Sequence, residues 1–326
     1  MSVNQVEVLV PIPIPEKFSY LLPDQIKNSP PRPGTRVIVP FGNRNLIGVV
    51  WAVGKNTAPK GKKLKYLKEV LDYEPLLDKA SLDLADWASR YYHYPLGEVI
   101  SYFFPPSIRK GKEAKFTELK FLELTSKGEF VNVEDLSKSP NQKKLIEVLK
   151  EKKELSQRAA NAYGVNSSSI NGLIDKGLVS RFMRELSPYK KEEFSSARSV
   201  KKKLNEEQKF AVDSIINSEK QNKVFLLNGI TGSGKTEVYL QAIQEVIKKG
   251  KQALILIPEI GLAPQTEKRF REYFGDRVLS FHSAKNDREK VDTWLGASKG
   301  LIDIVIGTRS SVFMPMKNIG VIVVDE

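Results

Sequence analysis

Apolar positions follow two different periods in the first third of the chain. The segments VEVLVPIPI (6–14), TRVIVP (35–40) and LIGVVWAV (46–53) are rich in β-branched residues, which predicts strands. The segment SLDLADWASRYYHY (81–94) has near-helical spacing and predicts a helix that Pro95 ends. Its expected apolar face comprises Leu82, Leu84, Ala85, Trp87, Ala88 and Tyr91. Residues 1–105 are therefore expected to form a β-rich domain.

A mostly helical pattern occupies residues 116–186. Residues 155–182 predict a helix, a glycine-containing turn, a second helix and a short strand, an order typical of a winged helix-turn-helix. We expect Ser167 to Ser169 to cap the second helix and Gly177 to end it. A plain helical hairpin shares this pattern, and a winged helix can serve as a spacer or a protein dock as well as a DNA reader.

Apolar runs and helical patterns alternate from Leu204 onward. Five runs predict strands: VFLLN (224–228), ALILI (253–257), VLSF (278–281), DIVIG (303–307) and VIVV (321–324). Strands that alternate with helices indicate a parallel sheet covered by helices. The last strand is expected to have an exposed edge. Two polar stretches, residues 107–115 and 187–203, are predicted to be linkers.

Composition favours a polyanionic partner. The chain has 52 Lys and Arg against 39 Asp and Glu, a net charge of +13, which points to nucleic acid first and an anionic membrane second. Nothing resembles a membrane span or a signal peptide, so a cytoplasmic location is expected. With no cysteine and only two histidines, a zinc cluster is not expected.

The strongest local motif is NGITGSGKTEVY (228–239). It matches the phosphate-binding pattern G-x-x-x-x-G-K-[ST], between a predicted strand and a predicted helix. Glycines allow backbone N–H groups to approach phosphate oxygens, Lys235 is placed to neutralise phosphate charge, and the Thr236 hydroxyl is a magnesium ligand. The predicted nucleotide-binding residues are Gly229, Thr231, Gly232, Ser233, Gly234, Lys235 and Thr236.

Two acids at the end of the last strand complete this chemistry. We expect Asp325 to hold magnesium and Glu326 to polarise the attacking water, and the Asp-Glu pair favours a helicase or translocase over a GTPase or small-molecule kinase. Gln208 lies just upstream of the predicted strand, where helicases often place a glutamine that recognises adenine. Arg309 follows another strand end, where single-stranded DNA would cross, although a surface arginine is the alternative. For His282 a structural role is favoured.

Taken together, the motifs resemble a known family along the whole chain. NGITGSGKTEVY, ILIPEIGLAPQT, HSAKNDREKVDTW, IVIGTRSSVF and KNIGVIVVDE are similar, in order and spacing, to the bacterial replication restart helicases (primosomal protein N′) of superfamily 2. In the first region FSYLLPD, PGTRVIVPFGNRNLIGVV, KEVLDYEP and YYHYPLGEVI are similar as well.

The resemblance implies a multidomain architecture. Residues 1–105 are expected to be a β-rich domain that binds the DNA 3′ end, 116–186 a winged helix, 187–203 a linker, and 204–326 an incomplete α/β RecA-like helicase lobe with a parallel sheet. In the family a pocket holds the terminal 3′ nucleotide, and its residues map to Phe18, Gly42 and Lys65. The residue after the aromatic is commonly acidic; here it is Ser19, a weaker acceptor for a 3′ hydroxyl.

The implied activity is ATP- and Mg²⁺-dependent 3′→5′ unwinding of DNA at stalled or abandoned replication forks, leading to primosome assembly. Implied partners are forked DNA with a leading-strand 3′ end, single-stranded DNA, primosome proteins and single-stranded DNA-binding protein, in a nucleoid-associated setting without a membrane. The family continues past Asp325 and Glu326 with a zinc-binding cysteine cluster and a second lobe, neither of which occurs in this sequence.

From that difference the chain is expected to be a piece cut inside the magnesium-binding motif. It is expected to bind forked DNA and not to unwind it, with ATP binding left open. The alternative is an ATP-independent module for forks and 3′ ends. A third hypothesis, a chromatin-remodelling or restriction motor, is disfavoured by the N-terminal similarity.

Overall fold

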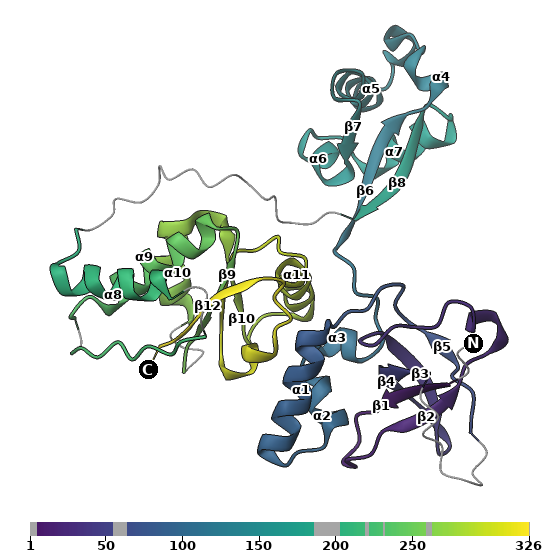
Figure 1. Cartoon of the computed structure of the whole chain (residues 1–326). Coiled ribbons are helices and arrows are strands. Elements are labelled where there is room, and N and C mark those ends of the chain that lie inside the picture. The colour runs from purple at the N-terminus through teal and green to yellow at the C-terminus, as the bar shows by residue number, and fades with distance from the viewer. Residues whose placement is uncertain are drawn as a thin grey trace. The chain divides into compact units, whose positions relative to one another are not determined.

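The computed structural model describes residues 5–54, 64–185, 203–218, 222–230, 232–258 and 263–325. The chain divides into two compact units (Figure 1): Met1–Ala114 together with Tyr189–Glu326, and Lys115–Pro188. Among the described residues, no helix is long and apolar enough to cross a membrane. The linker predicted at 187–203 lies outside the described residues except for Lys203.

An antiparallel sheet forms the first part of the larger unit. Its order is β2-β1-β4-β3-β5, with β1 (Gln5–Leu9), β2 (Phe18–Leu21), β3 (Arg36–Phe41), β4 (Arg44–Val53) and β5 (Glu69–Val70). The three strands predicted from apolar runs are confirmed, but β1 ends at Leu9 because Pro11 and Pro13 cannot donate to a ladder. Val6, Val8, Val37 and Val39 build the core of this sheet.

Three helices follow the sheet: α1 (Lys79–Tyr92), α2 (Leu96–Ser101) and α3 (Pro106–Arg109). In α1 the buried stripe is Leu82, Ala85 and Ala88, whereas Trp87 and Tyr91 are exposed, so the predicted apolar face was too wide. Positions 82, 85 and 88 recur every three residues and share one face, from which position 87 is turned away. His93, in the left-handed conformation, is the C-cap of α1. Pro95, which was predicted to end this helix, is the N-cap of α2.

Part of the segment predicted to be a linker, 107–115, is held against the first sheet. Ile108 is fully buried, and the guanidinium of Arg36 on β3 donates to the carbonyls of Ile108 and Lys112. Arg36 is itself buried and paired with Asp72 through its Nε and Nη2 atoms. A lysine-rich composition suggested a solvated segment, but a buried charge with several donors requires carbonyl partners, and this segment supplies them.

The smaller unit is a three-stranded antiparallel sheet with helices. Its strands, β6 (Glu118–Leu124), β7 (Glu154–Ser156) and β8 (Val179–Glu185), lie in the order β7-β6-β8. Its helices are α4 (Ser126–Glu129), α5 (Pro140–Lys152), α6 (Gln157–Ala162) and α7 (Ser167–Asp175). The side chain of Asn166 caps α7, so the predicted capping serines are wrong, while Gly177 ends the helix with φ 68° as predicted.

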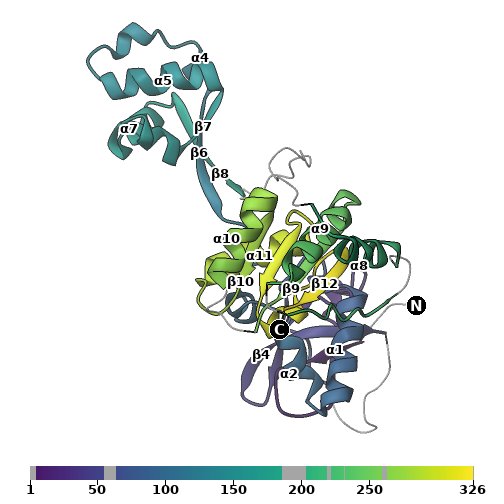
Figure 2. The ribbon, with the colours of Figure 1, turned by 90° about the vertical axis from the view of Figure 1, so that its left-hand side faces the viewer.

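A parallel sheet forms the second part of the larger unit. Its order is β10-β11-β9-β12, with β9 (Gln252–Leu256), β10 (Val278–Phe281), β11 (Ile304–Gly307) and β12 (Ile319–Val324). The helices are α8 (Glu206–Asn217), α9 (Lys235–Lys248), α10 (Ala263–Phe274) and α11 (Asp287–Ser298). Figure 2 shows α8 beside α9, and α9 with α10 near the sheet. The predicted parallel sheet is confirmed.

One predicted strand does not form. Residues 222–230, which include VFLLN, are described but adopt no strand, and Val224 is fully exposed. Within the described residues β12 is the edge of the sheet, and its Val324 is 72% exposed. An apolar β-branched run marks a segment suited to a sheet, but a strand exists only when its backbone pairs with a neighbour.

Candidate functional site

Three separate segments bring Phe18, Gly42 and Lys65 together. The ring of Phe18, at the start of β2, meets the ring of Phe41 edge-on, with centroids 5.2 Å apart. Phe41 ends β3, and Gly42 turns the chain into β4 with φ 57°, a conformation that favours glycine. The Nζ of Lys65 lies 3.3 Å from the Gly42 carbonyl oxygen. The aromatic, glycine and lysine predicted for a 3′-end pocket therefore lie within one small region.

Backbone pairing holds Lys65 in this place. The Leu21 N–H at the end of β2 donates to the Lys65 carbonyl at 3.0 Å, and the Leu67 N–H donates back to Leu21 at 2.9 Å. Ser19 is arranged differently. It pairs with Glu7 of β1, and alternation along a strand turns its side chain to the face opposite Phe18. Its predicted contact with a 3′ hydroxyl stays a prediction.

The phosphate-binding motif has the expected turn at the start of α9. Gly232 and Gly234 have φ of 84° and 88°, and Gly234 is the residue that precedes the first helical turn. Lys235 Nζ donates to the Gly229 carbonyl at 2.6 Å, which places its ammonium inside the loop. The N-terminus of α9 directs free backbone N–H groups into the same space, as anion binding requires. Thr231 lies outside the described residues.

Gln208 connects α8 to this loop. Its Oε1 accepts from the Asn205 N–H at 3.0 Å, while the Asn205 side chain accepts from the Gln208 N–H, a capping box at the start of α8. Its Nε2 donates to the Ser233 carbonyl at 3.0 Å. A side chain on Gly234 would collide with this amide, since a Cβ there would lie 2.4 Å from Nε2. Gln208 is thus within reach of the nucleotide loop.

The other predicted site residues of this sheet lie where its strands end. Gly307 of β11 and Val324 of β12 both pair with Leu256 of β9. Asp325 therefore follows on one side of β9, and Arg309, exposed at the start of a 3₁₀ turn (Arg309–Phe313), follows on the other. This is the carboxyl edge of a parallel sheet, where ligands of such folds bind. Glu326 lies outside the described residues.

Tyr239 of α9 reaches the same edge, and sequence reasoning missed it. Its hydroxyl donates to Asp325 Oδ2 at 3.4 Å, and Thr236 lies one turn earlier on the same helix. Burial raises the pKa of the Tyr239 hydroxyl above its ordinary value; Asp325 adds to the rise and Thr236 opposes it. The signal available in the sequence was its position three residues after Thr236, on the same face of a helix.

The donor chemistry at this edge fits magnesium. Thr236 and Asp325 offer hard oxygen donors, and Mg²⁺ in nucleotide sites takes one or two protein oxygens, with phosphates and water completing its shell. In the part of the chain that the structure describes, no group of three or more His, Cys, Asp and Glu gathers into a metal cluster. His282 lies in the turn after β10, and burial, followed by the charge of Lys285, lowers its pKa. The structural role predicted for it stays a prediction.

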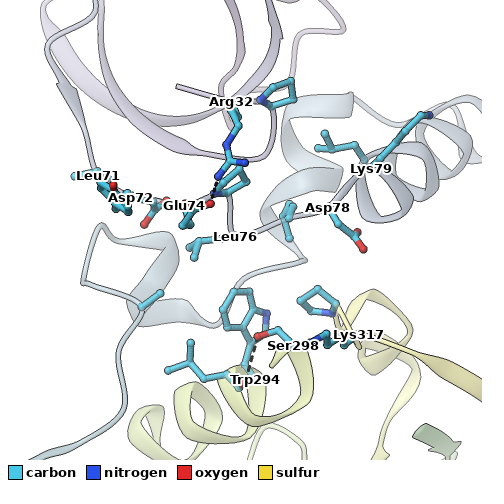
Figure 3. A pocket seen from close by; sticks show the side chains of 18 of the residues that line it. Arg32, Leu71, Asp72, Glu74, Leu76, Asp78, Lys79, Trp294, Ser298 and Lys317 are labelled. Atoms are coloured by element: carbon cyan, nitrogen blue, oxygen red, sulfur yellow. Dashed lines mark hydrogen bonds and ion pairs between the residues drawn. The ribbon is translucent and has the colours of Figure 1, made fainter. Parts of the chain in front are cut away.

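A crevice of about 1230 Å³ lies between the antiparallel sheet and α11 (Figure 3). Arg32 and Glu74 pair across its upper wall, while Trp294, Ser298 and Lys317 form the lower wall. Carboxylates and cations line it in similar numbers, so it offers no net charge for a polyanion. It contains none of the predicted site residues.

An exposed aromatic cluster on α1 is a further feature that sequence reasoning did not assign. The rings of Trp87 and Tyr91 are stacked with centroids 4.9 Å apart, and Tyr92 meets Tyr91 edge-on at 4.9 Å. All three side chains are at least half exposed. The spacing of aromatics four and five residues apart on one helix was the available signal, but it was interpreted as a core face.

Comparisons with known proteins agree with this geometry. Residues 7–105 match a family model described as a 3′ DNA-binding domain (3′BD) of PriA, and residues 201–326 match one described as the res subunit of type III restriction enzymes. Proteins named replication restart protein PriA are similar along the chain: 32% identity over 98% of it in Haemophilus influenzae and 30% over 99% in Bacillus subtilis. One from Synechocystis is 42% identical over 49% of the chain.

The match covers only part of those relatives. The chain spans 44% of the Haemophilus influenzae protein and 49% of the Bacillus subtilis protein, about half of their length.

Proposed function

The chain belongs with the replication restart proteins PriA, and from this premise we propose that it recognises DNA forks by the 3′ end of the leading strand and carries the ATP-binding lobe of a 3′→5′ DNA helicase. The PriA name describes replication restart, and the two family models describe DNA 3′-end binding and a restriction-enzyme motor subunit. Under this proposal the larger unit contains both the domain that binds the DNA 3′ end and the ATP-binding lobe. The proposed activity is ATP hydrolysis coupled to DNA unwinding.

The observation that carries the proposal is the convergence of Phe18, Gly42 and Lys65. A terminal base can stack on an aromatic ring, which is worth about 1–3 kcal/mol per base in single-stranded DNA sites. The ammonium of Lys65 can neutralise the last phosphate, and the turn at Gly42 lets the backbone come close to the sugar. An internal nucleotide continues into a next phosphate, whereas a chain end does not, so we propose that the site formed by these three residues selects chain ends.

Replacement of Phe18 tests this pocket. Fluorescence anisotropy would compare forks whose leading strand ends at the junction in a 3′ hydroxyl or a 3′ phosphate, at two salt concentrations. We expect the wild-type chain to prefer the hydroxyl, and Phe18→Ala to weaken binding of that fork about tenfold with loss of the preference. Phe130→Ala, which removes an exposed phenylalanine from the smaller unit, is the control.

Equal binding of the two forks by the wild-type chain, with a steep loss of affinity at high salt, would contradict the 3′-end function. Binding would then be explained by counterion release from the basic surface alone.

We further propose that the loop at Gly229 to Thr236 binds ATP. Lys235 neutralises the phosphates, Gln208 contributes to adenine recognition, and Thr236 and Asp325 hold Mg²⁺, with Glu326 orienting the attacking water. When bound, the metal neutralises charge that develops on the phosphate oxygens. Arg309 belongs to the path of single-stranded DNA across the carboxyl edge of the sheet.

A second candidate function is ATP-independent fork binding by these 326 residues alone. Residues 222–230, which lead into the nucleotide loop, lie outside the sheet, so the loop lacks a strand to anchor it. Under this proposal the chain binds forks but neither hydrolyses ATP nor separates strands. Strand displacement by the purified chain, in an assay with a fluorescently labelled fork, would exclude it.

The remaining assignments follow from the family. We propose a 3′-end domain at residues 1–105, a winged helix at 116–186, a linker at 187–203 and the helicase lobe at 204–326, acting on the nucleoid in the cytoplasm. Protein partners would be primosome proteins and single-stranded DNA-binding protein. Zinc belongs to the longer family members.

A further inference from the structure

The hydroxyl of Tyr239 contacts one of the two residues proposed to hold magnesium, and Tyr239 shares a helix with the other. Tyr239 lies three residues after Thr236, one turn along α9, so the two side chains share a helix face. Its hydroxyl donates to Oδ2 of Asp325, which follows the end of β12, at 3.4 Å. One phenol therefore connects α9, which begins at the nucleotide loop, with the edge of the sheet.

The ring of Tyr239 is held in place by the core of the lobe. Tyr239 is 8% exposed and belongs to the main apolar cluster between the sheet and its helices. Its ring is stacked against Phe270 of α10, with centroids 6.2 Å apart and an interplanar angle of 17°. A tyrosine has only two soft torsions, so a packed ring leaves the hydroxyl little freedom to move. The position of the hydroxyl is thus imposed by the fold.

Asp325 needs such a partner because it has little support of its own. It follows the edge strand, and among the described residues the sheet continues on one side of β12 only. Its backbone N–H donates to the Leu256 carbonyl at 2.9 Å, which fixes the main chain but not the carboxylate. A hydrogen bond from a rigid phenol to Oδ2 restricts rotation of the carboxylate, as partners of metal ligands do in other sites.

We propose that Tyr239 is a positioning residue of the nucleotide site: its hydroxyl holds the Asp325 carboxylate in the orientation that Mg²⁺ requires, one helical turn from the Thr236 hydroxyl. The inference rests on the proposed nucleotide site and adds to it a residue outside the phosphate-binding motif. Magnesium tolerates little deviation from octahedral geometry, so ligand orientation decides its affinity. Tyr239 also links the start of α9 directly to the end of β12, and a shift of one is transmitted to the other.

Replacement of Tyr239 by phenylalanine separates this role from packing. The ring, its stacking on Phe270 and the core volume are retained, and only the hydroxyl is lost. The measurement is binding of a fluorescent ATP analogue to the full chain while Mg²⁺ is titrated, with a parallel series in EDTA. We expect Tyr239→Phe to raise the Mg²⁺ concentration needed for half-maximal enhancement about tenfold, with binding in EDTA unchanged within about twofold. Tyr273→Phe, in a tyrosine of α10 packed on the same cluster, is the control.

The possible outcomes are distinguishable. An unchanged Mg²⁺ dependence in Tyr239→Phe, while the wild-type chain binds the analogue, would overturn the inference and leave the nucleotide site standing. An equal loss of binding with and without Mg²⁺ would also overturn it, because the hydroxyl would then act on the loop as a whole. If the wild-type chain shows no Mg²⁺-dependent binding, the nucleotide site itself fails, and the positioning role fails with it.

Discussion

At the residue scale, burial decides what each charged side chain does. Arg36 and Asp72 are almost inaccessible to water and satisfy each other, and Arg36 also ties down the carbonyls of the 108–112 segment. Arg32 and Glu74, close by in sequence, form an ion pair that is largely exposed. An arginine–carboxylate pair thus makes one interaction that holds elements together and another that solvent screens.

We expect Arg36→Ala to lower the free energy of unfolding by about 3–5 kcal/mol, because it leaves the Asp72 carboxylate buried without its partner. Arg32→Ala should cost less than about 1 kcal/mol. Urea unfolding followed by tryptophan fluorescence measures both. Equal losses of unfolding free energy in the two variants would contradict this, because burial of the Arg36–Asp72 pair would then add nothing to its stabilising effect.

At the element scale, local sequence determines where helices begin. The side chains of Asn205 and Asn286 cap α8 and α11. Three residues later, the side chain of Gln208 or Glu289 accepts a hydrogen bond from the backbone N–H of the capping asparagine, which completes a capping box. These two boxes are visible in the sequence as Asn-x-x-Gln and Asn-x-x-Glu. The strand predicted at VFLLN shows the opposite behaviour, because a strand requires a partner that local residues cannot supply.

Asn286→Ala is expected to reduce stability by about 1 kcal/mol, since the first turn of α11 loses the acceptor for the Glu289 N–H. Asn286→Ser retains an acceptor oxygen and should stay within a few tenths of a kcal/mol of the wild type. Thermal unfolding by circular dichroism compares the two. A serine variant as unstable as the alanine variant would argue against capping as the cause.

At the scale of the larger unit, the antiparallel sheet domain and the helicase-like lobe share buried contacts. Trp294 of α11 donates its indole N–H to the Phe103 carbonyl at 2.7 Å, across 191 positions of sequence, and its ring lies 6.1 Å from that of Phe104. Phe313, in the turn that begins at Arg309, packs against Phe103 at 5.1 Å. These contacts link the two parts of the larger unit mechanically.

Trp294→Phe keeps most of the apolar contact and removes the indole donor, so the buried Phe103 carbonyl loses its hydrogen bond. We expect the free energy of unfolding to fall by about 1–3 kcal/mol. We also expect limited proteolysis to separate the antiparallel sheet domain from the helicase-like lobe more quickly. Trp87→Phe changes an exposed tryptophan on α1 and should alter neither. Unchanged protease sensitivity in Trp294→Phe would show that this contact does not hold the parts together.

The sequence by itself determined the elements with strong local signals: the parallel sheet and the helix that follows the phosphate-binding motif. Periodicity, glycine placement and end caps depend on neighbours within a few residues, so they can be recognised in the sequence without knowledge of the tertiary structure. The grouping of Phe18, Gly42 and Lys65 came from the resemblance, since no local pattern connects positions that far apart.

Only the tertiary structure decided which apolar residues are buried and which partners polar groups find. It turned Trp87 and Tyr91 outward, bound the carbonyls of the 108–112 segment to Arg36, left VFLLN outside the sheet and placed the Tyr239 hydroxyl beside Asp325. The physical reason is common to all four. The groups that bury a side chain or complete its hydrogen bonds are distant in sequence. A local pattern therefore predicts which structures a segment can form, and contacts with the rest of the chain determine which one it adopts.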